Sequence, residues 1–132
     1  MIKSIAALAL LVSTSALADA PHFGRTALAT EDGASAQSAF APDTPKIVLH
    51  VEILDMPQDT KIAADWIAVK TDAAPPNFKI TSAEKDLDDD VEDDEMSFSL
   101  TKPDSGWPVG DYKVDLSIDG KTVKSVPFRI VK

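Results

Sequence analysis

The 132-residue chain has no cysteine, only five glycines, few aromatic side chains and a shortage of positive charge. The absence of cysteine excludes disulfides, thiolate metal ligands, a cysteine nucleophile and a lipid-modified cysteine. The formal net charge of −9 disfavours nucleic acid and anionic lipid as partners, because both require clustered lysine and arginine. A basic partner or a divalent cation fits this charge better.

The first 18 residues are predicted to be a secretory signal peptide. Lys3 supplies the positive start, residues 5–12 form an apolar run too short to span a bilayer, and Ala16-Leu17-Ala18 matches a cleavage site. The mature chain is therefore expected to be periplasmic or secreted, with no membrane insertion after cleavage. Residues 19–38 are rich in small residues and lack hydrophobic periodicity, so they are predicted to be a flexible leader.

From residue 39 onward, alternating apolar and polar residues predict a series of short strands. This period of two places successive side chains on opposite faces of a half-buried strand. The segments with the pattern are 46–54, 62–69, 78–82, 96–101, 112–118 and 122–132. A change of phase within the last segment predicts a bulge near Ser125, and Asp119-Gly120 predicts a tight hairpin turn. Residues 39–132 are thus expected to form one all-β sandwich domain.

Two aromatic residues and one hairpin resemble features of immunoglobulin-like and fibronectin-type domains. Trp66 resembles their buried core tryptophan, and Tyr112 stands where they carry a tyrosine corner. The P-x-G-x-Y-x-V pattern from Pro108 to Val114 is similar to a hairpin of small exported bacterial β-sandwich proteins of unknown function. The resemblance covers about residues 40–132 and implies an immunoglobulin-like β-sandwich of about seven strands, without the inter-sheet disulfide of antibody domains.

The most unusual chemical feature is an acidic run between residues 86 and 95, which is expected to be a loop. Its alternating aspartates match the first ligand positions of an EF-hand, but Val91 and Ser97 stand where that motif needs glycine and glutamate. A Ca²⁺ site of another kind remains one alternative, and a solvated, mobile loop is the other. The residues that would bind Ca²⁺ are Asp86, Asp88, Asp90 and Glu92.

A partner surface is the third interpretation of the same run. Trp107, beside Pro108, belongs either to the core or to a partly exposed anchor, since tryptophan is enriched at binding hot spots. The residues predicted to contact a partner are Asp89, Asp93, Asp94, Glu95 and Trp107. Neither a catalytic triad nor a phosphate-binding glycine loop is recognisable, so the chain is predicted to be no enzyme and to need no cofactor besides the alternative Ca²⁺.

These observations predict a monomeric, non-enzymatic binding or accessory module. It would recognise a basic protein or peptide partner through its loops, where charge complementarity raises encounter rates. A Ca²⁺-binding sandwich that uses the acidic run is the first alternative. A protease-inhibitor-like sandwich is the second, although the loop motifs of such inhibitors are not evident in this chain.

Overall fold

A computed structural model describes residues 20–30 and 35–132 of the chain, so the predicted signal peptide lies outside the described residues. Within this part there is no helix, and hence none long and apolar enough to cross a membrane. The strands are β1 (His22–Thr30), β2 (Ala39–Phe40), β3 (Lys46–Met56), β4 (Lys61–Thr71), β5 (Phe78–Asp86), β6 (Val91–Thr101), β7 (Gly110–Ile118) and β8 (Lys121–Ile130).

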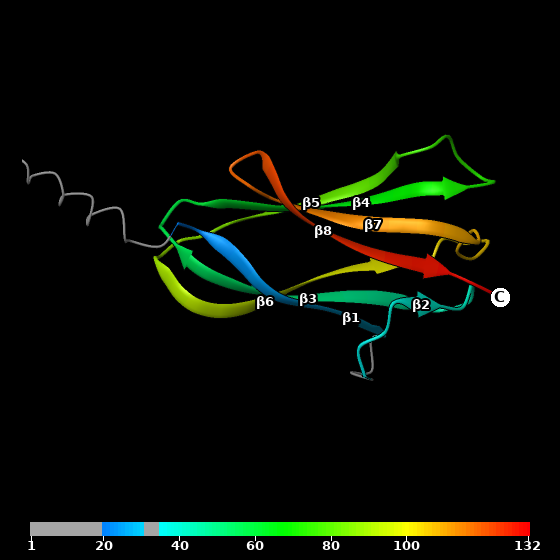
Figure 1. Cartoon of the computed structure of the whole chain (residues 1–132), viewed down its shortest axis with the longest axis horizontal. Helices are drawn as coiled ribbons and strands as arrows, with labels where there is room; N and C mark the ends of the chain where they lie inside the picture. Colours follow the sequence, from blue (N-terminus) through cyan, green and yellow to red (C-terminus); the bar gives the residue numbers. More distant parts are fainter. Residues whose placement is uncertain (1–19, 31–34) are drawn as a thin grey trace, which may run out of the picture.

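The strands form two sheets that face each other as the two layers of a sandwich (Figure 1). The smaller sheet has the order β1-β3-β6, and the larger has the order β2-β8-β7-β4-β5. All pairs are antiparallel except β2 with β8, which is parallel. The prediction of an all-β sandwich is confirmed.

The core lies between the sheets and is built by the alternation that the sequence shows. Its centre is aromatic: Phe128 of β8 packs edge-on against Trp66 and Phe40, with ring centroids 6.1 and 6.0 Å away. Tyr112 stacks on the same phenyl ring at 5.1 Å. Offset and edge-to-face pairs of this kind add stabilisation beyond that of the buried area. Trp66 is 1% exposed, as expected of a core tryptophan.

The start of β7 has the geometry of a tyrosine corner. The Tyr112 hydroxyl donates a hydrogen bond to the Pro108 carbonyl four residues upstream, and the ring is buried. Burial of this phenol raises its pKa from 10.0 to about 12. At the other end of β7, Asp119 and Gly120 have φ values of 51° and 88°, which a two-residue type I′ hairpin requires.

The prediction of a flexible leader over residues 19–38 is wrong for most of the described part, because residues 22–30 are strand β1. This strand pairs with β3, and Phe23 and Leu28 are buried in the core. A register shift between Phe23 and Thr26 breaks the alternation, which hides the strand from a search for period two. The folded domain therefore includes residues from His22 onward rather than from residue 39.

The bulge predicted in the last strand is present, but two residues earlier than expected. Leu116 pairs with Lys124 and Ser117 with Thr122, so Val123 has no opposite residue. Pro127 pairs with β7 on one side, while β2 covers only Arg129 and Ile130 on the other. The proline thus occupies an edge position, where its missing N–H costs no ladder hydrogen bond.

Candidate functional site

The acidic run does not form the loop that was expected over residues 86–95. Asp86 is the last residue of β5, only residues 87–90 form the turn, and β6 begins at Val91. The register between β3 and β6 continues without a shift from Lys46 opposite Thr101 to Met56 opposite Val91. Main-chain pairing therefore extends through the acidic residues. The strand tolerates these charges because it lies at a sheet edge, where their side chains remain in water.

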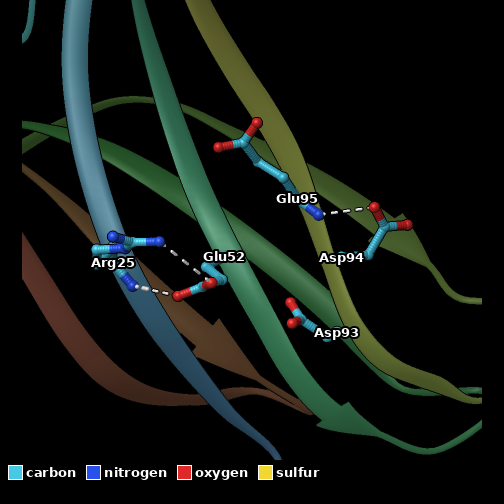
Figure 2. Close-up of a pocket in the computed structure, with 5 residues that line it drawn as sticks. All are labelled: Arg25, Glu52, Asp93, Asp94 and Glu95. Atoms are coloured by element: carbon cyan, nitrogen blue, oxygen red, sulfur yellow. Dashed lines mark hydrogen bonds and ion pairs between the residues drawn. The ribbon is translucent and has the colours of Figure 1, made fainter.

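Residues 92–95 of β6 divide between the two faces of the small sheet. Glu95 lies opposite Glu52 of β3, whereas Asp94 lies opposite Ile53, whose side chain is buried. Directly opposite residues share a face, so Asp94 is on the core side and Asp93 and Glu95 are on the outer side. Figure 2 shows this division: Asp94 projects from the side of β6 away from Glu52. An inward-pointing charge on an edge strand opposes edge-to-edge association.

On this outer face, Glu52 is the carboxylate that combines a backbone hydrogen bond with an ion pair. The backbone N–H of Arg25 donates a hydrogen bond to its Oε1 at 3.0 Å, and the guanidinium lies 3.9 Å from Oε2 (Figure 2). The Glu52 side chain is 28% exposed, while that of Arg25 is 92% exposed. A shallow recess of about 330 Å³ is bounded by these two residues and by Asp93, Asp94 and Glu95.

The other carboxylates of β6 have no basic partner within the described ranges, although Asp94 Oδ1 accepts a hydrogen bond of 2.8 Å from the backbone N–H of Glu95. Among the described residues, no lysine or arginine forms an ion pair with Glu92, Asp93, Asp94 or Glu95. Glu95 also faces the like charge of Glu52 directly across the strands, an arrangement that is unfavourable by itself. The edge strand thus presents a negative potential whose counter-charge is not supplied within the described part of the fold.

The four residues predicted to bind Ca²⁺ are spread over the end of β5, the turn and the start of β6. Asp90 accepts a hydrogen bond of 2.7 Å from the backbone N–H of Gln58, which fixes the turn against the loop after β3. Asp86, Asp88 and Glu92 are exposed. Across residues 20–30 and 35–132, no group of three or more histidine, cysteine or acidic side chains is arranged to hold a metal ion. The Ca²⁺ site stays a prediction.

Trp107 belongs to the core, which was one of the two roles considered for it. The side chain is 3% exposed, and its Nε1–H donates to the Thr44 carbonyl at 2.8 Å. Its ring also meets Tyr112 edge-on, at a centroid distance of 6.1 Å. The expectation of a partly exposed anchor is therefore wrong, although the indole still forms one wall of a surface pocket.

That pocket is the feature that the sequence analysis missed. It has a volume of about 190 Å³, lies near the start of β5, and is almost entirely apolar. Phe78 and Ile80 of β5 are among its walls, with exposed fractions of 48% and 36%. Other walls are Ala68, Pro103, Trp107 and Tyr112. The sequence does suggest a strand at Phe78, but it does not show that the strand lies beyond the cover of the smaller sheet.

Comparisons with known proteins add little to this geometry. No protein-family model matches the chain, and no curated protein matches it. Among solved structures, a crystal structure of a β-glucosidase from Kluyveromyces marxianus is similar, with a TM-score of 0.46 and 14% sequence identity. The similarity covers 82% of this chain but only 14% of the β-glucosidase chain. At this level of similarity, the comparison carries no functional argument.

Proposed function

We propose that this chain is an exported, non-enzymatic module that binds a basic protein or peptide segment through the acidic edge strand β6. The observation that carries the proposal is that, in the described part of the chain, the carboxylates of residues 92–95 form no ion pair with a lysine or arginine and lie next to Glu52 on the neighbouring strand. Export of the chain is supported by the signal-peptide pattern of residues 1–18. The negative field of such a surface accelerates encounter with a cationic partner and repels acidic ones.

We further infer that the sandwich is of the immunoglobulin-like or fibronectin type. The strand order supports this if β1, β3 and β6 correspond to strands A, B and E, and β4, β7 and β8 to strands C, F and G. The remaining long strand, β5, extends the sheet that contains C, as additional strands do in variable-type domains. The Tyr112 corner and the buried Trp66 support the same assignment.

The expected affinity is modest and depends on salt. Exposed ion pairs contribute about 0.2–1 kcal/mol each, so several contacts along β6 are needed for measurable binding. The Debye length falls from about 30 Å at 0.01 M salt to about 8 Å at 0.15 M salt, so binding should weaken markedly over this range.

The test compares two variants that remove the same charge from different places. Asp93→Asn/Glu95→Gln neutralises the outer face of β6, and Asp72→Asn/Asp104→Asn neutralises two exposed carboxylates outside that face. A lysine-rich peptide is titrated into each protein at low and at moderate salt. Binding that weakens several-fold in the first variant only supports the proposal. Equal affinity in the two variants, or no binding to the native protein at low salt, would overturn it.

A further inference from the structure

One side of the sandwich, which we call the open flank, is bounded by the strands β5 and β6. In the described part, β5 pairs only with β4 and β6 only with β3, so each is an edge of its sheet. The turn at residues 87–90 joins the two strands at one end of the flank. At the other end, the apolar pocket brings together Phe78 and Ile80 of β5 with Pro103, which follows β6 by two residues.

The free edge of β5 is available for an additional strand. Its nine residues contain no proline, and no strand of the described chain pairs with its outer side. A register shift with β4 leaves Ile80 as a bulged residue, and the unpaired N–H and C=O groups along the strand on either side of it are a template for main-chain hydrogen bonds with an extended peptide. Eight of the nine residues are exposed, so no side chain of the sandwich covers this edge deeply.

The size of the pocket limits what enters it. A volume of about 190 Å³ is below the range of about 300–1,000 Å³ that is usual for sites that bind drug-sized molecules. A single aliphatic or aromatic side chain suits this volume and the apolar walls. Strand addition presents side chains of this kind, because alternate residues of an added strand point toward the same face.

The opposite end of the flank is strongly acidic. Residues 84–95 hold nine carboxylates and a single lysine. Asp94 lies on the core-facing side of β6, and therefore on the side that borders the flank. A strand that runs the length of β5 spans nine residues, about 27 Å at the usual rise per residue. Such a strand extends from the apolar pocket at Phe78 to the carboxylates around the turn.

We propose that the open flank binds an extended basic peptide by strand addition to β5. One apolar side chain of the peptide enters the pocket beside Phe78, and lysines or arginines near its other end face the carboxylates around residues 87–90. The preference for a basic partner rests on the proposed function, whereas the strand addition and the apolar anchor do not. A second copy of the chain fits poorly, because antiparallel pairing of two β5 strands would bring Asp86 of one against the pocket of the other.

The test uses labelled nine-residue peptides and fluorescence anisotropy at low salt. The reference peptides alternate polar and β-branched residues, with a leucine near one end and two lysines near the other, in both chain directions. Replacing the leucine by alanine should weaken binding about tenfold or more, since it removes most of a buried aliphatic side chain. Methylation of alternate backbone nitrogens should abolish binding, since it removes the donors of the added strand. These peptide changes leave the protein unaltered.

Two protein variants form a matched pair. Phe78→Ser removes an apolar wall of the pocket, and Val123→Ser removes a side chain of equal exposure, 48%, from β8. Of the two variants, only Phe78→Ser should weaken binding of the reference peptide, by about tenfold. The Phe78→Ser variant should then bind the leucine peptide and the alanine peptide with equal affinity. Equal binding by the two variants, an unchanged affinity of the methylated peptide, or no binding of the reference peptides would overturn the proposal. The proposal would also be overturned if the native protein formed a dimer and the Phe78→Ser substitution dissociated it.

The two proposals fail in different ways. If Asp93→Asn/Glu95→Gln abolishes binding while Phe78→Ser has no effect, the open flank is not the site, and the acidic strand still explains the binding. If Phe78→Ser abolishes binding while peptides with glutamate in place of lysine bind equally well, the flank is a strand-addition site without charge selection. That result would overturn the basic preference of the flank, whereas the proposed function would still be decided by the comparison of Asp93→Asn/Glu95→Gln with Asp72→Asn/Asp104→Asn.

Discussion

Replacing Tyr112 by phenylalanine should remove one hydrogen bond and leave the packing of the ring unchanged. The hydroxyl donates to the Pro108 carbonyl, while the ring stacks on Phe128 and meets Trp107 edge-on. A single neutral hydrogen bond contributes about 1 kcal/mol to stability, so Tyr112→Phe should lower the free energy of unfolding by about that amount at neutral pH. Tyr112→Ala removes the ring as well and should cost about 3–5 kcal/mol.

The native protein and the Tyr112→Phe variant should respond differently to alkaline pH. Burial raises the pKa of Tyr112 to about 12 in the folded state, from 10.0. The folded state therefore holds the phenolic proton more tightly than the unfolded state. The resulting stability is fully present below pH 10 and is lost as the pH rises through 12. At pH 11 the native protein should have lost about 1.4 kcal/mol that the phenylalanine variant does not lose.

Urea unfolding at pH 7 and pH 11, followed by tryptophan fluorescence, measures both effects. The advantage of the native protein over Tyr112→Phe should be about 1 kcal/mol at pH 7 and should disappear by pH 11. Lysines titrate in the same range in both proteins, so the difference between them isolates the phenol. A constant difference at the two pH values would refute the assignment of a buried, neutral phenol. A near-neutral Tyr112→Ala would refute the tyrosine corner itself.

Two further predictions concern the acidic side of the fold. A Cβ at Gly24 would overlap the Glu52 carboxylate, which is the end of a flexible side chain and can move aside, so Gly24→Ala should destabilise by no more than about 1 kcal/mol in urea unfolding, chiefly through loss of the hydrogen bond from Arg25 N–H to Glu52. Glu52→Ala should then cost less in the Gly24→Ala variant than in the native protein, and strictly additive costs would contradict the overlap. If the carboxylates of residues 86–92 bind Ca²⁺, millimolar Ca²⁺ should raise the melting temperature by mass action, whereas Mg²⁺ at the same concentration should raise it less. An unchanged melting temperature would rule out the Ca²⁺ site.

Much of the sandwich could be predicted because its strands alternate in hydrophobicity. Residues such as Ile47, Leu49 and Trp66 show this period of two directly, and the structure buries all three. The turn at Asp119 was equally predictable, since few residues tolerate its positive φ. These features are local, so a single sequence is enough to find them.

The errors occurred where the pattern was broken or where charge hid it. A register shift interrupts β1 after Phe23, so its remaining apolar residues fall out of phase. In β6, Asp94 occupies the position that pairs with the buried Ile53 of β3, and the low hydrophobicity of the acidic residues resembles that of a loop. Pairing with a neighbouring strand keeps both segments extended despite their sequences. Strand preference depends on that tertiary context more than on the residues themselves.

The candidate site could be predicted only in part. The chemistry of the acidic residues is visible in the sequence, but their division between two faces follows from the register with β3. The apolar pocket depends on sheet order, because β5 extends beyond the strands that could cover Phe78. Strand order is a long-range property, and no local pattern around Phe78 encodes it.

The parallel pairing of β2 with β8 has a consequence for how the chain folds. It joins Phe40 to Ile130, and β8 also supplies Phe128, on which Phe40, Trp66 and Tyr112 all pack. The aromatic centre of the core is therefore incomplete until β8 has been synthesised. Contacts so distant in sequence close slowly, since loop-closure entropy must be overcome first. A chain growing from the ribosome would therefore keep an incomplete core, open to chaperones, until β8 has emerged.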